Sequence, residues 1–92
     1  MFSTPHPNVI KSDAFSVEVL GRTGLRYTDH HTSRTVRIDS ELLAGPAGIV
    51  VYADSIMNWE APPERITDTE RITIVERINE AFKFRGYEIE VI

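Results

Sequence analysis

Two adjacent histidines, His30 and His31, are the residues whose type most directly suggests metal chemistry. Histidine nitrogens are common zinc ligands, and Asp29, just before the pair, could add a carboxylate oxygen. Adjacent residues of a strand point to opposite faces, however, so both rings could bind one metal only from an irregular loop. The chain contains no cysteine and no third histidine nearby. We therefore predict no metal site and interpret the two histidines as solvated turn residues.

Recognisable catalytic and nucleotide-binding motifs do not occur in the sequence. It contains no G-x-S-x-G nucleophile elbow, no P-loop and no G-x-G-x-x-G. Acid–base catalysis needs paired groups in a cleft with shifted pKa values. The 14 carboxylates guarantee accidental pairs and single out no two of them. The sequence thus predicts neither catalytic residues nor a cofactor, and we expect a non-enzymatic protein.

Four carboxylates bracket the start of a predicted helix. Carboxylates in and before the first turn stabilise the helix dipole by about 0.3–1 kcal/mol each. One or two of them would serve that purpose, so the surplus favours a second role in contacting a basic partner. A tryptophan adjoins the group, and tryptophan is enriched at binding hot spots. Our candidates for a partner-binding surface are Trp59, Glu60, Glu64, Asp68 and Glu70.

Trp59 also has a structural interpretation. It follows an apolar segment and precedes Pro62 and Pro63, whose rings fix φ and whose nitrogens cannot donate a hydrogen bond. We expect a stiff connection from Trp59 to the helix start, with the indole packed against the core near Ile66. Two roles stay open at this stage: structural pinning of this corner, and an exposed ring edge at a partner surface.

Charge is distributed unevenly along the chain, whose net charge is −4. Residues 1–40 carry five Lys or Arg and four Asp or Glu, a balance of +1, and residues 41–92 carry five and ten, a balance of −5. Nucleic-acid binding depends on a basic surface, so we expect a basic protein partner and no nucleic acid. No apolar run is long enough for a signal peptide or a membrane span. We expect a cytoplasmic protein with no membrane partner.

Alternating apolar and polar residues predict short strands near residues 15–19, 25–28 and 35–38, joined by tight polar turns. The continuous apolar run 49–52 predicts a fourth strand that is covered on both faces. For residues 49–59 as a whole, one bent strand and a short hairpin fit equally well.

A helix is predicted to begin at Thr67, because Thr67-Asp68-Thr69-Glu70 matches the capping box. Gly86 is a typical residue for its C-terminal cap, and a final strand is predicted over 87–91. The expected apolar stripe of the helix consists of Ile72, Val75, Ile78 and Phe82, joined by Ile74 and Ala81.

The order of these elements is β-β-β-β-α-β, which is typical of an α+β fold. We predict a two-layer sandwich with a mainly antiparallel sheet of about five strands and one long C-terminal helix packed on one face. Residues 1–12 contain two prolines and few apolar neighbours, so we expect a loose N-terminal segment there. Residues 13–92 are expected to form a single α+β domain.

Four features follow one another along the chain: the strand around Tyr27; Asp39-Ser40-Glu41-Leu42; the pattern Ile56-x-x-Trp59-x-x-Pro62; and the helix from Ile66 to Gly86 with a short strand after it. In order and spacing, over residues 17–92, they resemble a family of small immunity proteins from bacterial polymorphic-toxin systems. The resemblance implies a non-enzymatic module that binds a cognate toxin domain made by the same cell and blocks its activity. It implies no catalytic residues and does not name the toxin. On electrostatic grounds, the acidic second half suits a toxin with a basic active-site groove, such as a nuclease.

A second class of function stays open. The chain could be a small structural or oligomeric α+β domain, or an enzyme whose site is assembled from scattered residues or across a dimer. The sequence determines neither the oligomeric state nor the identity and activity of the partner, nor the surface that binds it. A buried cleft with strongly perturbed carboxylates or histidines would favour this second class.

Overall fold

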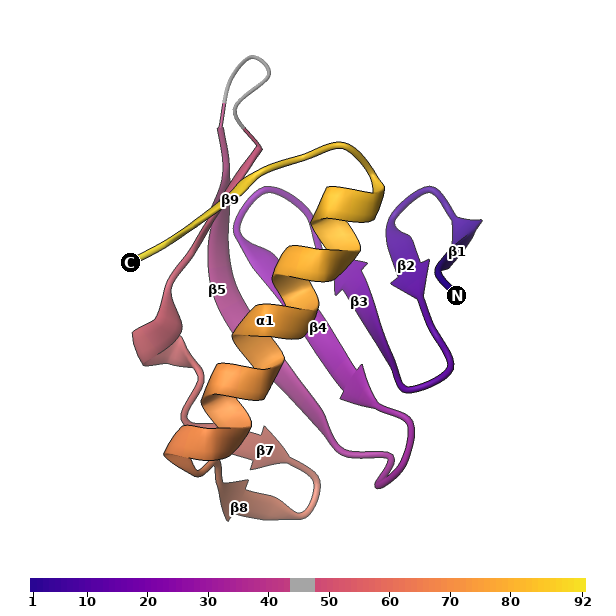
Figure 1. Cartoon of the computed structure of the whole chain (residues 1–92). Helices are drawn as coiled ribbons and strands as arrows, with labels where there is room; N and C mark the ends of the chain where they lie inside the picture. The colour runs from indigo at the N-terminus through magenta and orange to yellow at the C-terminus, as the bar shows by residue number, and fades with distance from the viewer. Residues whose placement is uncertain (44–47) are drawn as a thin grey trace.

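The computed structural model describes residues 1–43 and 48–92, in which one α-helix lies across one face of a seven-stranded sheet (Figure 1). The spatial order of the strands is β1-β2-β3-β4-β5-β6-β9, and a separate two-stranded ribbon is made of β7 and β8. The elements are β1 (Ser3–His6), β2 (Val9–Lys11), β3 (Phe15–Val19), β4 (Gly24–Asp29), β5 (Thr35–Leu42), β6 (Ile49–Val51), the 3₁₀ turn η2 (Ala53–Ser55), β7 (Asn58–Glu60), β8 (Pro63–Arg65), α1 (Asp68–Phe84) and β9 (Ile89–Val91).

The main sheet is antiparallel from β1 to β6, and β9 pairs parallel with β6. The central strands alternate as the sequence predicts. Val17 pairs with Tyr27, and Leu25 pairs with Ile38, so these side chains share the face that packs against α1, where they are buried. All three residues of β6 are buried, in agreement with the continuous apolar run. The α+β class and the mainly antiparallel sheet are therefore confirmed.

The sheet has seven strands rather than about five, and the N-terminal segment expected to be loose contributes two of them. β1 and β2 lie within residues 1–12, so the sheet extends across the boundary predicted at residue 13. Ile10 is buried opposite Val17, and the Phe2 ring packs edge-on against Phe15 with centroids 5.7 Å apart. Strands of three and four residues, one of them containing Pro5, are too short to show alternation in the sequence.

The segment 49–59 is neither a bent strand nor a hairpin. β6 ends at Val51, η2 follows, and β7 then begins in the separate ribbon. Ser55 holds this turn, because its Oγ donates to the carbonyl oxygen of Tyr52 (2.6 Å) and accepts from the backbone N–H of Asp39 (2.9 Å). The chain thereby leaves the main sheet, and the antiparallel hairpin forms later, between β7 and β8.

Helix α1 begins at the predicted capping box. The Thr67 hydroxyl accepts from the Glu70 backbone N–H (3.1 Å), and the Glu70 carboxylate accepts from the Thr67 N–H (2.9 Å). Ile72, expected in the apolar stripe, is exposed because a residue two positions from the buried Ile74 lies about 200° around the helix. α1 is not C-terminal, and the final strand predicted over 87–91 is present as β9, which returns to the sheet beside β6. The buried residues of α1 are Ile74, Ile78, Ala81 and Phe82.

The start of β6 requires a glycine. Gly48 has a φ of +99°, in the left-handed region, and a Cβ atom at this position would overlap the carbonyl oxygen of Glu88. The same carbonyl accepts the backbone N–H of Ile49 (3.2 Å), which is the first hydrogen bond between β6 and the segment leading into β9. The close approach at Gly48 therefore fixes where β9 joins the sheet.

We expect Gly48→Ala to lower the melting temperature by more than Gly21→Ala. Both glycines have positive φ, +99° and +111°, so both substitutions carry a backbone strain of about 1–2 kcal/mol. Nothing lies within 4 Å of a Cβ atom at Gly21, so the difference between the two thermal unfolding curves isolates the overlap with Glu88. Equal melting temperatures would show that β9 can shift without cost.

Candidate partner-binding surface

The five partner-binding candidates lie at one end of the molecule. Trp59 and Glu60 belong to β7, Glu64 to β8, and Asp68 and Glu70 to the first turn of α1. Trp59 pairs opposite Glu64 in the ribbon, and the chain runs from β8 into the start of the helix (Figure 1). We call the four carboxylates among them, Glu60, Glu64, Asp68 and Glu70, the ribbon surface.

Trp59 lies beneath this surface and supports it. Only 4% of the residue is exposed. Its ring packs beside Tyr27 with centroids 6.3 Å apart, and the guanidinium carbon of Arg34 lies 6.0 Å from the ring centroid in a cation–π arrangement. The indole Nε1 is buried and has no hydrogen-bond partner among the described residues. This packing agrees with the structural interpretation of Trp59.

The two ribbon carboxylates are ion-paired with arginines of the main sheet region. Glu64 Oε2 lies 3.0 Å from Arg34 Nη2, and Glu60 Oε1 lies 3.7 Å from Arg26 Nε. Arg26 belongs to β4 and Arg34 immediately precedes β5, so these pairs connect the ribbon to the sheet. Exposed ion pairs contribute about 0.2–1 kcal/mol each. Cations of a binding partner could therefore replace these arginines at little cost.

The two carboxylates at the helix start are engaged within α1. Asp68 Oδ1 lies 2.7 Å from Arg71 Nη1, and Glu70 completes the capping box. Arg71 Nε also donates to the carbonyl oxygen of Ile56 (3.0 Å), which connects the first helical turn to the chain before β7. The Asp68 side chain is 93% exposed, so among the three ion-paired carboxylates of this surface it is the most accessible to a partner.

All four carboxylates of the ribbon surface thus have an intramolecular partner. The sequence indicated a surplus of negative charge here, and the structure instead shows that three of the four carboxylates are paired with arginines, whereas Glu70 caps the helix. The difference arises because β4 and the turn before β5 bring two arginines to the ribbon from segments that lie far from it along the chain.

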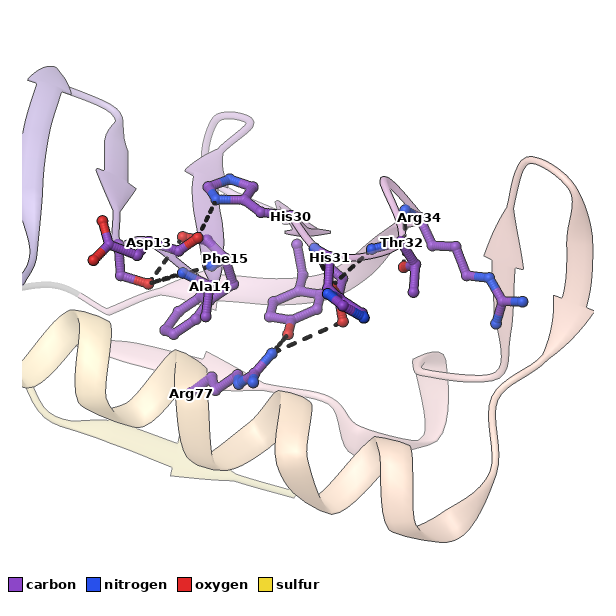
Figure 2. Close-up of polar contacts among 11 residues, drawn as sticks. Asp13, Ala14, Phe15, His30, His31, Thr32, Arg34 and Arg77 are labelled. Carbon is purple, nitrogen blue, oxygen red and sulfur yellow. Dashed lines mark hydrogen bonds and ion pairs between the residues drawn. The ribbon is translucent and has the colours of Figure 1, made fainter.

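A residue that the sequence did not single out, Arg77, joins the helix to the sheet beside the ribbon surface. Figure 2 shows its side chain reaching from the helix, where Nη1 donates to the Tyr27 hydroxyl (2.7 Å) and lies 3.9 Å from Asp29 Oδ2. Its guanidinium carbon lies 5.2 Å from the Phe15 ring centroid. Burial raises the pKa of Tyr27, and the hydrogen bond from Arg77 lowers it to a smaller extent. In the sequence, Arg77 directly precedes Ile78, a residue of the predicted apolar stripe that the structure shows to be buried. This position at the border of the stripe was the available signal that the Arg77 side chain reaches the sheet.

Two of the cavities that the described residues form lie beside the helix. The smaller has a volume of about 160 Å³ and adjoins the ribbon surface, so it is too small for a typical ligand site of about 300–1,000 Å³ and suits a single partner side chain. Its lining contains the aromatic and arginine residues that recur at binding hot spots: Tyr27, Asp29, Trp59, Thr69, Glu70, Thr73, Ile74 and Arg77. The larger is an apolar groove of about 430 Å³ that includes Phe82, Arg85 and Tyr87, near the C-terminal end of α1.

The two histidines lie in the turn between β4 and β5. Asp29 Oδ1 accepts the backbone N–H groups of His31 (2.8 Å) and Thr32 (3.3 Å), and His30 Nδ1 lies 3.3 Å from the carbonyl oxygen of Asp13 (Figure 2). Within residues 1–43 and 48–92, no three His, Asp or Glu side chains are placed to hold a metal ion. In the same part of the chain, no helix is long and apolar enough to cross a membrane.

One comparison with known proteins gives a match. The family model described as Immunity protein 74 matches residues 17–92. No curated protein and no solved structure matches the chain. The matched range begins inside β3, includes the whole ribbon surface and α1, and leaves out β1 and β2.

Trp59→Ala should lower the free energy of unfolding by about 3–5 kcal/mol, as truncation of a well-packed tryptophan does. This loss should exceed that of any single change among the four carboxylates, because three of them form largely exposed ion pairs and the fourth, Glu70, caps the helix. Trp59→Phe is the matched control, because it keeps an aromatic ring and removes the unpaired N–H, and we expect a smaller loss. Denaturant unfolding measures all of these variants. If Trp59→Ala unfolds like the parent but no longer binds a partner, Trp59 is a binding anchor and the packing interpretation is wrong.

Proposed function

The chain belongs to the Immunity protein 74 family, and from this membership we propose that it neutralises a cognate bacterial toxin domain by binding it directly in the cytoplasm. The observation that carries the proposal is the extent of the match, which includes the helix, the ribbon and most of the sheet. Immunity proteins are generally non-enzymatic. The proposed mechanism therefore needs a complementary surface and no catalytic residue.

We place the toxin contact on the ribbon surface. Its exposed carboxylates are held on a stiff support, since Trp59 is packed beneath them and the capping box fixes the helix start. A support that is already rigid reduces the entropy lost on binding. Lysine or arginine side chains lining a toxin groove would replace Arg26 and Arg34 as the partners of Glu60 and Glu64, and a basic groove of this kind is typical of a nuclease.

Co-expression with the domain encoded immediately upstream of this protein's gene tests the proposed function. Cells that produce the upstream domain alone should stop growing, and cells that produce both proteins should grow. An inactivated variant of the domain controls for the burden of expression, and co-purification shows whether a complex forms. Growth arrest in spite of normal levels of both proteins would contradict toxin neutralisation and favour a structural or oligomeric role.

Association with the toxin should be steered by charge. Complementary charges act mainly on the association rate, and salt screens them beyond about 8 Å at physiological ionic strength. We expect the rate, measured by stopped-flow fluorescence, to fall by about tenfold or more between low and high salt. The double change Glu60→Lys and Glu64→Lys should slow association at low salt while the melting temperature changes little, because the ion pairs that it breaks are exposed.

The matched control for this double change is Glu76→Lys with Glu80→Lys. Both residues are exposed on α1, and the change in net charge is the same. The control should slow association less, because its charges lie away from the ribbon surface. An association rate that does not depend on salt, or equal slowing by both double variants, would rule out steering through the ribbon surface.

A further inference from the structure

Within residues 1–43 and 48–92, β9 is the last strand of the sheet and pairs only with β6 (Figure 1). The backbone of Glu88 and Ile92 faces β6, because Ile49 N–H donates to the Glu88 carbonyl (3.2 Å) and Ile92 N–H donates to the Val51 carbonyl (3.0 Å). In a strand, successive residues direct their backbone groups to opposite sides. The N–H and C=O groups of Ile89 and Val91 therefore point away from the sheet, toward the free edge.

The two outer strands differ in how far they are protected from further pairing. Proteins blunt edge strands with proline, bulges, charge or short length. β1 contains Pro5 and a register irregularity in its pairing with β2. β9 has no proline and no bulge, and Val91 and Ile92 beside its free backbone groups are 43% and 63% exposed. Its protection from further strand pairing comes from its short length and from the charges of Glu90 and of Glu88, which directly precedes it.

The side chains of β9 divide cleanly between the two faces of the sheet. Glu90 lies opposite Val50, which in turn lies opposite Glu41, so Glu90 is on the face away from the helix. Glu88 is two residues before Glu90, so its side chain lies on the same face of the sheet. Ile89 packs against the hydrophobic core on the helix side, and Val91 shares that side. A strand added beside β9 would thus meet carboxylates on one face and apolar side chains on the other.

Charge favours a basic strand over a second copy of this chain at this edge. Among the described residues, neither Glu88 nor Glu90 makes an ion pair, in contrast to the carboxylates of the ribbon. A second copy would pair β9 with β9 in antiparallel orientation about a two-fold axis. A register centred on Ile89 or on Glu90 would then set carboxylates of the two copies directly opposite each other, which is destabilising. A strand with basic residues at these positions would be stabilised instead.

We propose that the free edge of β9 binds an extended strand of the cognate toxin domain, in which basic residues on one face alternate with apolar residues on the other. This proposal rests on the proposed function and adds to it a second contact, made by backbone hydrogen bonds. Ile89 and Val91 supply those hydrogen bonds, and Glu88 and Glu90 select the charge of the partner strand.

Val91→Pro tests the edge with little effect on the fold. Proline removes the outward N–H of residue 91, which makes no bond to β6, and edge strands tolerate proline when the N–H faces solvent. Titration calorimetry with the toxin domain that the protein neutralises should show binding weakened about tenfold or more, because a hydrogen bond is lost and its acceptor is left unpaired. Val91→Ala is the matched control, since it trims the side chain and keeps the N–H, and it should bind nearly as the parent does.

If Val91→Pro does not fold, a second variant tests the edge. If the upstream domain is not neutralised, a peptide tests the edge without the toxin. Glu88→Lys with Glu90→Lys should weaken toxin binding without a change in the unfolding transition. The peptide Lys-Val-Lys-Val-Lys-Val-Lys should shift the amide NMR signals of Ile89 and Val91, and the peptide Glu-Val-Glu-Val-Glu-Val-Glu should not.

Neutralisation that Val91→Pro leaves unchanged would overturn the edge contact and leave the proposed function standing. Failed rescue together with the expected peptide shifts would overturn the function and leave the edge as a site for basic strands. Peptide shifts that fall elsewhere, or that are equal for both peptides, would overturn the edge site itself.

Discussion

A single helix has to cover the apolar face of a wide sheet, and most of the structure follows from this constraint. A helix is about 10–12 Å wide, whereas seven strands spaced at about 4.8 Å extend over roughly 29 Å. Aromatic side chains complete the cover. They form a row from Phe84 through Phe2, Phe15 and Tyr27 to Trp59, with successive ring centroids 5.5, 5.7, 5.7 and 6.3 Å apart. Phe84 of α1 and Trp59 of β7 are the two ends of this row, and Phe2, just before β1, is its second member, so the N-terminal segment and the ribbon are held by the same aromatic packing.

The parts of the fold that could be predicted are those whose signal is local. The alternation around Val17 and Tyr27 and the capping box at Thr67 each depend on residues a few positions apart, and the structure contains them as expected. β1, β2, β7 and β8 have three or four residues each and are too short to leave a periodic pattern in the sequence, although β1 and β2, like β7 and β8, form a local hairpin. The candidate site has a different limit, which is distance along the chain. Its residues were found from a local cluster of charge, but Arg26 and Arg34 come from other segments, and only the folded chain shows that they pair with it.

Ion pairs offset the negative charge of residues 41–92 in some places and not in others. At the ribbon, arginines offset the carboxylates, so a partner there exchanges one ion pair for another. At β9, Glu88 and Glu90 have no ion-pair partner among the described residues, so a cation there gains a new interaction without displacing an old one. We therefore expect binding at the two places to differ in salt sensitivity and in selectivity, although their carboxylates are chemically alike.

The proline in β1 has a consequence for self-assembly. A sheet with two open edges can add copies head to tail, and a contact of that kind does not close on itself, so it generates filaments. In this protein, Pro5 and the irregular register of β1 remove one of the two surfaces that such growth requires. Any copy or partner strand that pairs with β9 therefore joins a molecule whose other edge is closed to further pairing. The asymmetry of the two edges therefore leaves β9 as the edge at which a strand can be added, and it blocks head-to-tail growth into filaments.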